Sequence, residues 1–158
     1  LPGETSSDTQ AIAVDGANRK WIGTQSGGVF LMSVDGTQQI RNFNESNSPL
    51  LSNNIVSIAI NSATGEVFFG TDKGVCSYKG DAIEGNEGCT HVYVYPNPVR
   101  ENYDGPIAIT GLASDGQVKI TDVSGHLVYE TKALGSQAIW DGKKFDGKRA
   151  QSGVYLVL

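Results

Sequence analysis

Short apolar stretches rich in β-branched residues alternate along the chain with polar turns that contain glycine. This pattern predicts β-strands, and in the first half the strands fall into two successive sets. The first set is Ile12–Asp15, Lys20–Thr24, Gly28–Met32 and Gln39–Phe43. The second set is Ile55–Ile60, Glu66–Thr71 and Gly74–Tyr78. Gln39–Phe43 is the candidate outer strand of the first set.

The two sets are related by an internal repeat. WIGTQSGGVF at residues 21–30 returns as FFGTDKGVCSY at residues 68–78, and Ile12 upstream corresponds to Ile58. The offset is 46 or 47 residues, and a period in the forties is typical of a four-stranded propeller blade. Because about four to eight blades are needed to close a ring, we expect the last two blades of a longer array. The alternative is a chance echo within one antiparallel sandwich.

The repeat resembles the two-component-regulator propeller family, whose hallmark is an Asp-Gly or Asn-Gly turn followed by W-I-G-T and then Gly with an aliphatic residue. The resemblance covers residues 10–80 and implies a propeller without naming a ligand. The second copy departs from the hallmark, with Phe68 and Phe69 in place of the Trp-Ile pair and Asn61 at the usual Asp.

The pattern changes after residue 80. Residues 81–91 are rich in glycine and acidic residues and predict a linker between a propeller part, residues 1–80, and a second module, residues 92–158. Six short strands separated by polar turns in the second module predict a small β-sandwich, so the fold class is all-β. The predicted strands are Val92–Tyr95, Ile107–Thr110, Val118–Asp122, Leu127–Thr131, Ala138–Trp140 and Val154–Leu158.

The motifs of this second module are more specific than its strands. VYPNPV, VKITDVSGHLVYET and GVYLV resemble the C-terminal sorting domain of type IX secretion, and WDGKKFDGKRAQSGVYLVL resembles the Ig-like domain of flagellar hook-capping proteins. Sorting domains usually continue past GVYLV into a further strand, whereas this sequence stops at Leu158.

Propeller repeats followed by such a sandwich resemble the PorZ-like family of type IX secretion accessory proteins. The resemblance implies a non-enzymatic protein on the cell surface of a Gram-negative bacterium. Its implied partners are an anionic lipopolysaccharide glycan and type IX secretion subunits. Two alternatives remain: the periplasmic sensor propeller of a hybrid two-component system, and an exported enzyme carrying a sorting domain.

Composition narrows the functional classes. The net charge is −5, only 18% of residues are charged and no Lys/Arg run occurs, so the basic footprint of a nucleic-acid-binding protein is missing. No apolar stretch approaches the roughly 18 residues needed to span a bilayer. We therefore expect neither a nucleic-acid partner nor a membrane span.

Residues for metal binding or catalysis are sparse. His91 and His126 lack ligand partners at metal-binding spacing, so we expect no metal, no cofactor and no catalytic residues. Asp141-Gly142 and Asp146-Gly147 fit either calcium loops or turns, and turns are favoured. Cys76 and Cys89 are a candidate disulfide, unless Cys76 is simply buried.

Candidate binding residues lie in polar loops. They are Asn18, Arg19, Lys20, Asn44 and Asn47. Trp21 and Trp140 fit either a sugar-stacking platform or the core, and the repeat position shared by Trp21 and Phe68 favours the core.

Overall fold

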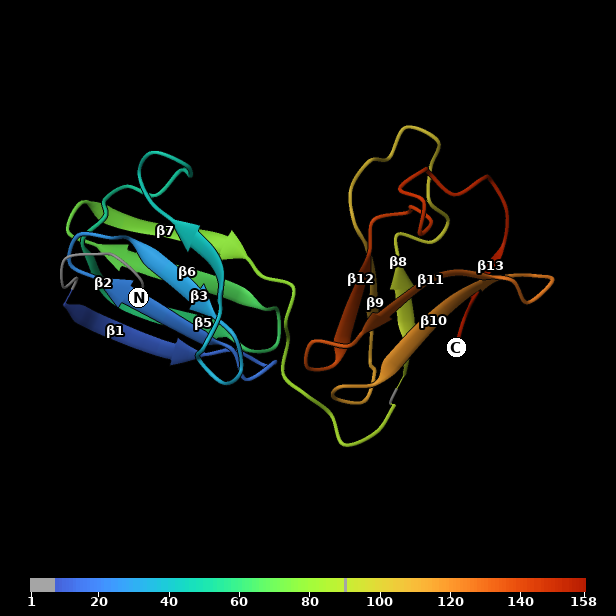
Figure 1. Ribbon diagram of the computed structural model, residues 1–158, viewed down its shortest axis with the longest axis horizontal. Helices are drawn as coiled ribbons and strands as arrows, with labels where there is room; N and C mark the ends of the chain where they lie inside the picture. Colours follow the sequence, from blue (N-terminus) through green and yellow to red (C-terminus); the bar gives the residue numbers. More distant parts are fainter. Residues whose placement is uncertain (1–7, 90) are drawn as a thin grey trace. The chain divides into compact units, whose positions relative to one another are not determined.

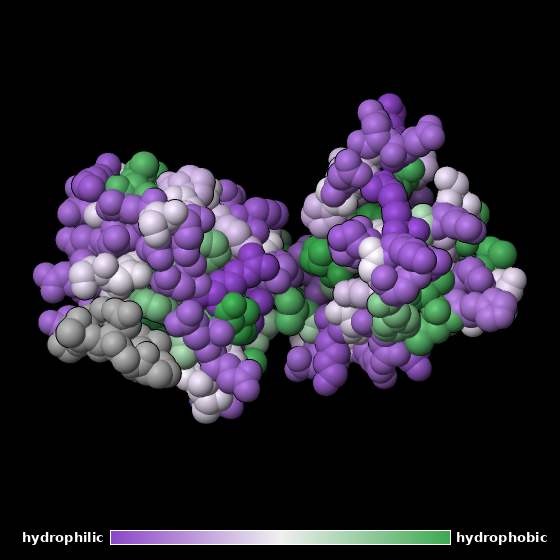
Figure 2. Space-filling view, turned by 45° about the horizontal axis from the view of Figure 1, so that its top comes forward, coloured by the Kyte–Doolittle hydropathy of each residue, from purple (hydrophilic) through white to green (hydrophobic). Residues whose placement is uncertain are grey.

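The computed structural model describes residues 8–89 and 91–158, and within them every regular element is a β-strand (Figure 1). The all-β prediction is confirmed. The chain divides into two compact units, Leu1–Glu84 and Gly85–Leu158. On the face shown in Figure 2, polar residues cover most of each unit and apolar residues form separate patches.

The first unit consists of two antiparallel sheets. The first sheet has the order β1-β2-β3-β4, with strands β1 (Thr9–Val14), β2 (Lys20–Thr24), β3 (Val29–Met32) and β4 (Gln39–Phe43). The second has the order β5-β6-β7, with strands β5 (Ile55–Asn61), β6 (Glu66–Thr71) and β7 (Gly74–Lys79). Within residues 8–89 and 91–158, the second sheet has no counterpart of β4.

The two sheets pack around one core cluster. Its buried members are Trp21, Val29, Leu31, Leu50, Ile55, Val67 and Phe69. Gly23 is required at this contact, because a Cβ there would lie 2.5 Å from Cγ2 of Ile55. A glycine on β2 therefore makes room for the first residue of β5.

Repeat-equivalent residues of the two sheets have opposite burial. Ile12 on β1 is 64% exposed, whereas its equivalent Ile58 packs against the core cluster. Trp21 is 1% exposed, whereas its equivalent Phe68 is 37% exposed. Equivalent faces of the two sheets therefore point in the same direction. The face of the first sheet that carries Trp21 packs against the second sheet. The face of the second sheet that carries Phe68 is turned away from the first sheet.

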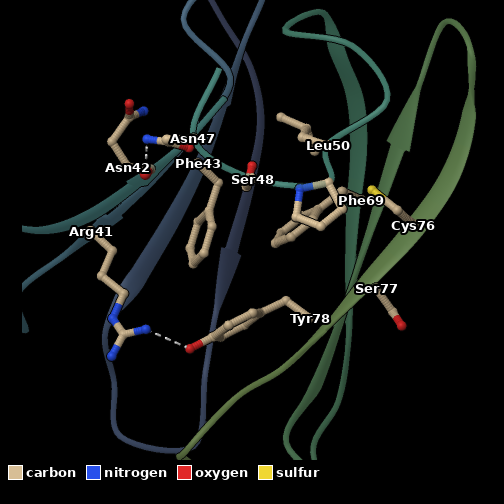
Figure 3. A pocket seen from close by; sticks show the side chains of 11 residues that line it. Arg41, Asn42, Phe43, Asn47, Ser48, Leu50, Phe69, Cys76, Ser77 and Tyr78 are labelled. Atoms are coloured by element: carbon tan, nitrogen blue, oxygen red, sulfur yellow. Dashed lines mark hydrogen bonds between the residues drawn. The ribbon is translucent and has the colours of Figure 1, made fainter. Parts of the chain in front are cut away.

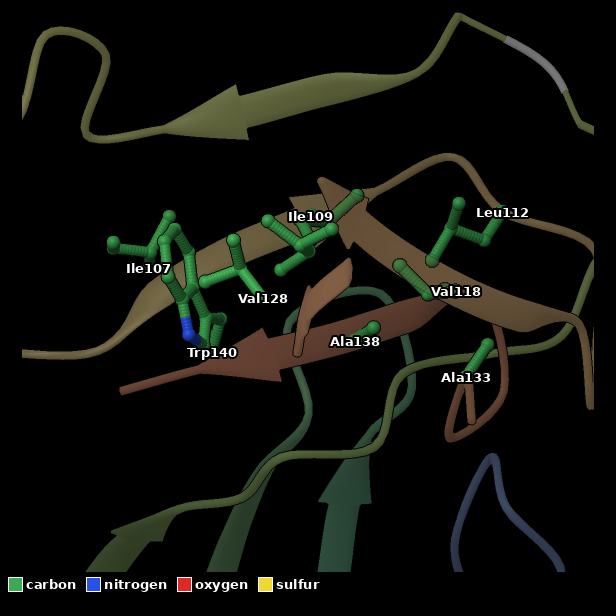
Figure 4. Packing of buried hydrophobic residues seen from close by; sticks show 9 residues of the cluster. Ile107, Ile109, Leu112, Val118, Val128, Ala133, Ala138 and Trp140 are labelled. Atoms are coloured by element: carbon green, nitrogen blue, oxygen red, sulfur yellow. The ribbon is translucent and has the colours of Figure 1, made fainter. Parts of the chain in front are cut away.

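The second unit contains two three-stranded sheets. One has the order β12-β9-β8, with strands β8 (Tyr93–Tyr95), β9 (Ile107–Thr110) and β12 (Gln137–Trp140). The other has the order β11-β10-β13, with strands β10 (Gln117–Asp122), β11 (Leu127–Lys132) and β13 (Tyr155–Val157). The core between them includes Ile109 of β9, Val118 and Ile120 of β10, and Trp140 of β12 (Figure 4).

Candidate functional site

A cleft of about 500 Å³ opens in the first unit between β4 with its following loop and β7. The lining residues are Arg41, Asn42, Phe43, Asn47, Ser48, Pro49, Leu50, Phe69, Cys76, Ser77 and Tyr78 (Figure 3). None of them is acidic, and Arg41 is the single charged residue among them.

Aromatic rings form the apolar wall of the cleft. The ring centroids of Phe43 and Tyr78 lie 4.8 Å apart, and Phe69 lies 6.2 Å from Phe43. Trp21 packs behind all three, with centroid distances of 5.7 to 6.0 Å. The cleft thus reaches the aromatic core of the unit.

Polar side chains of β4 in the cleft are held by hydrogen bonds to neighbouring strands and turns. Arg41 donates a hydrogen bond to the Tyr78 hydroxyl at 2.8 Å and so bridges β4 and β7. The Asn42 amide donates to the carbonyl oxygens of Gly27 and Val29. The cleft therefore combines an aromatic wall with amide, hydroxyl and guanidinium groups.

The structure separates the candidate binding residues into two groups. Asn18 and Lys20 lie at the β1–β2 turn, where the Lys20 ammonium donates to the Asn18 carbonyl at 2.7 Å. Asn44 and Asn47 lie in the β4–β5 loop, at the opposite end of the strands. In that loop the Asn44 side-chain oxygen accepts hydrogen bonds from the backbone N–H groups of Ser46 and Asn47, so Asn44 holds the loop in place.

Arg19 is buried rather than presented to solvent, since only 6% of it is exposed. Its guanidinium binds the Asp15 carboxylate at 2.8 Å and the Asp81 carboxylate at 2.6 Å. Burial lowers the pKa of Arg19, but the hydrogen bonds and charges of Asp81 and Asp15 outweigh it, so the pKa lies above its ordinary value. Asp15 also accepts a hydrogen bond from the Trp21 indole at 3.1 Å. This cluster fastens the chain after β7 to the β1–β2 turn.

The candidate disulfide is not formed, and both cysteines are free thiols. Cys76 is half-buried and packs against the core cluster of the first unit, between the two sheets. Cys89 is exposed and belongs to the second unit. The prediction is therefore corrected, because the face of β7 that carries Cys76 is turned toward the first sheet.

Both tryptophans are core residues, as the repeat pattern favoured. Trp140 is 6% exposed, and its indole donates to the Lys143 carbonyl at 2.7 Å. The turn interpretation of the Asp-Gly pairs is confirmed, because Asp141 and Asp146 each accept a hydrogen bond from the backbone N–H two residues later. Among residues 8–89 and 91–158, no three His, Cys, Asp or Glu side chains are grouped to hold a metal ion.

Asp35, in the β3–β4 turn, should titrate well below an ordinary aspartate. Hydrogen bonds from the Ser33 hydroxyl, and then from the hydroxyl and backbone N–H of Thr37, lower its pKa from 3.8 to about 2. The carboxylate therefore stabilises the fold above pH 4, and that contribution is lost as the pH falls toward 2. NMR titration should find this low pKa and a higher one in Ser33→Ala, and an unchanged pKa in the variant would contradict the assignment to Ser33.

A second cavity, of about 660 Å³, lies in the second unit between β8 and β13. Core residues of both sheets reach it, including Ile109, Ile120 and Trp140. Val94 of β8 and Val157 of β13 also line it and are only partly buried. The two sheets are thus open to solvent along this edge.

One comparison with known protein families matches the second unit. Residues 93–158 match the family model of the secretion system C-terminal sorting domain. The structure of PorZ, described as an essential bacterial surface component of the type IX secretion system of Porphyromonas gingivalis, matches 96% of the chain. The sequence identity is 38% and the TM-score is 0.63. The chain is PorZ-like.

The PorZ match covers both units of the chain but only 20% of PorZ itself, so the chain spans about a fifth of its length. The extracellular domain of a proposed hybrid two-component system protein of B. thetaiotaomicron also matches, over 84% of the chain and 17% of its own length. Its identity is 22% and its TM-score is 0.40. No curated protein matches the chain. No helix within the described residues is long and apolar enough to cross a membrane.

Of the residues that line the β4–β7 cleft, Asn47 was a candidate binding residue and Cys76 a candidate disulfide partner, and the others were not singled out from the sequence. Alternation along Gln39–Phe43 and Gly74–Tyr78 does predict which residues share a strand face. It does not indicate that Phe43 and Tyr78 meet, because that contact joins strands of two different sheets.

Proposed function

We propose that this chain is the C-terminal part of a non-enzymatic accessory protein of type IX secretion, exported to the cell surface. The observation that carries the proposal is the sorting-domain match at residues 93–158 within a PorZ match that spans both units. A match over both units to a surface component of the secretion system favours an accessory protein over an unrelated cargo.

We propose that the two sheets of the first unit are adjoining propeller blades. Equivalent faces of consecutive blades point the same way around a ring. Two adjoining blades therefore bury one of two equivalent residues and expose the other, as is seen for Ile58 and Ile12. A sandwich with its halves related by a two-fold axis would instead bury both residues alike. Ile12 and Val14, 64% and 53% exposed, would then face a preceding blade, and Phe68 a following one.

The role proposed for the blades is recognition of an anionic surface glycan alongside secretion subunits. The β1–β2 turn offers the exposed amide of Asn18 next to the Lys20 ammonium, which suits a sugar bearing negative charge. Asn18 has a φ of +57°, so Asn18→Gly removes the amide while keeping the backbone conformation. The full-length variant should bind purified lipopolysaccharide several-fold more weakly, and unchanged binding would remove this turn from the site.

Retention of the sandwich tests the accessory role. Cargo is expected to lose its sorting domain on maturation, whereas an accessory subunit keeps it. Intact-mass spectrometry of the surface-located protein should therefore find residues 93–158 present. Deletion of the gene should also leave cargo unprocessed and unattached. Loss of the sandwich on maturation, or normal cargo processing in the deletion strain, would refute the proposal.

A further inference from the structure

Six Asp-Gly pairs lie in turns and loops of the two units. Their aspartates are Asp15, Asp35, Asp104, Asp115, Asp141 and Asp146. An aspartate isomerises most readily before glycine, because glycine has no side chain to hinder the approach of its backbone nitrogen to the carboxyl carbon. The sequence contains no Asn-Gly pair, which would react in the same way. The pairs are alike in sequence, so their surroundings decide which of them reacts.

Four of the six carboxylates are held inside their own turns. Each accepts a hydrogen bond from the backbone N–H two residues later, at 3.0 to 3.1 Å. The pairs of acceptor and donor are Asp15 with Ala17, Asp35 with Thr37, Asp141 with Lys143, and Asp146 with Lys148. A carboxylate held in this way has to lose a charge-assisted hydrogen bond before it can turn toward the glycine nitrogen.

The fifth carboxylate, that of Asp104, is held by an ion pair. The Arg149 guanidinium lies 2.6 Å from it. The side chains of Asp104 and Arg149 are 88% and 50% exposed, so water screens the attraction between them. Asp104 is therefore held more weakly than the four turn aspartates.

Asp115, in the turn between β9 and β10, is the exception. It is exposed, and within residues 8–89 and 91–158 no hydrogen bond or ion pair holds its carboxylate. Its φ is +58°, in the left-handed region that residues with a side chain rarely adopt. None of the other five aspartates has a positive φ. Asp115 thus combines a free carboxyl group with a strained backbone.

The nitrogen of Gly116 is no better protected than that of other glycines in these pairs. Its N–H donates to the Ala113 carbonyl at 3.1 Å, and this bond must open before the nitrogen can react. The N–H groups of Gly36 and Gly147 make comparable turn bonds at 2.9 Å. The state of the carboxylate therefore distinguishes Asp115 from Asp35 and Asp146.

We propose that Asp115-Gly116 is the site at which this chain isomerises spontaneously to isoaspartate. The Gly116 nitrogen attacks Cγ of Asp115 and loses its proton, and a carboxyl oxygen leaves as water, which closes a five-membered succinimide. Water then adds to the main-chain carbonyl carbon of Asp115 and breaks its bond to the Gly116 nitrogen. The main chain afterwards runs through Cβ and Cγ of Asp115. One water is lost and one is regained, so the step needs no oxidant or reductant.

The change would act on a turn that holds the first residues of the second unit. The backbone N–H and the hydroxyl of Ser114 donate to the Asn86 carbonyl at 2.9 and 3.1 Å. The Gly116 carbonyl accepts a hydrogen bond from the Ala133 N–H at 2.8 Å. An additional main-chain carbon between Asp115 and Gly116 displaces these groups, so we expect isomerisation to loosen the turn.

Ageing of the purified full-length protein at neutral pH, followed by tryptic mapping with electron-transfer fragmentation, tests the proposal. Cleavage after Arg100 and Lys119 places Asp104 and Asp115 in one peptide, so each is the internal reference of the other. Isoaspartate should form several-fold faster at Asp115 than at Asp104, and about tenfold or more faster than at the four turn aspartates. Equal or faster conversion at any of the other five aspartates would overturn the proposal.

Two controls test whether the fold selects the site. Arg149→Ala frees the Asp104 carboxylate, so conversion at Asp104 should rise toward that of Asp115 while the rate at Asp115 stays the same. An unchanged rate at Asp104 would contradict the role assigned to held carboxylates. In the protein unfolded in urea, the six pairs should convert at similar rates. A preference for Asp115 that persists there would come from local sequence and would also overturn the proposal.

Discussion

Replacing Asp15 with alanine is expected to lower the free energy of unfolding of the first unit by about 3–5 kcal/mol, the usual effect of breaking a buried ion pair. The Asp15 side chain is only 2% exposed and binds the Arg19 guanidinium at 2.8 Å. It also accepts hydrogen bonds from the Trp21 indole and from the backbone N–H groups of Ala17 and Arg19. Its loss leaves Arg19 buried with Asp81 alone, which is itself 39% exposed.

Denaturant unfolding followed by tryptophan fluorescence measures this effect, because Trp21 lies beside the cluster. Asp35→Ala is the matched control, since Asp35 also accepts hydrogen bonds from its own turn but is fully exposed. The control should cost much less than Asp15→Ala, because substitutions at exposed positions usually have small effects. Similar losses in the two variants would show that the buried cluster contributes no more than an ordinary turn.

Ile109→Ala should destabilise the second unit by about 2–5 kcal/mol, the range for truncating a large aliphatic residue in a core. Ile109 lies on the central strand β9 and is 0% exposed between the two sheets. The cavity along the β8–β13 edge already reaches it, so the truncation widens an opening instead of creating a closed void. We therefore expect a value in the lower half of this range.

Val123→Ala is the control for this variant, because Val123 is 70% exposed in the β10–β11 turn. Its effect should stay within about 0.5 kcal/mol. Chemical unfolding monitored through Trp140, which packs in the same core, measures both variants. An Ile109→Ala cost as small as that of Val123→Ala would mean that the two sheets do not share the described core.

Strand positions were predictable from the sequence because their causes are local. Lys20–Thr24, Gln39–Phe43 and Glu66–Thr71 form strands with the predicted bounds, since alternation and turn residues act over a few positions. The ends of other strands differ by a few residues. The predicted Ile12–Asp15, for example, is observed as Thr9–Val14, because Asp15 leaves the ladder to bind the turn and Arg19.

The candidate site was much less predictable. Arg19 sits in a polar turn and resembled an exposed ligand residue, but one of its partners, Asp81, lies 62 residues away. Cys76 and Cys89 are close in sequence, yet they belong to different units and remain free. The burial of an arginine and the pairing of two cysteines depend on which distant segments of the chain contact each other. Composition and residue spacing do not specify those contacts directly.

The sequence by itself determined an all-β chain with a repeated strand pattern, and its motifs pointed to the sorting domain that the family match then showed. Only the tertiary structure decided which face of each sheet is covered. Ile12 and Ile58 occupy the same position in the repeat, but one is exposed and the other packs in the core. The physical reason is that the strand period assigns a residue to a face, whereas its burial depends on whether another sheet packs against that face.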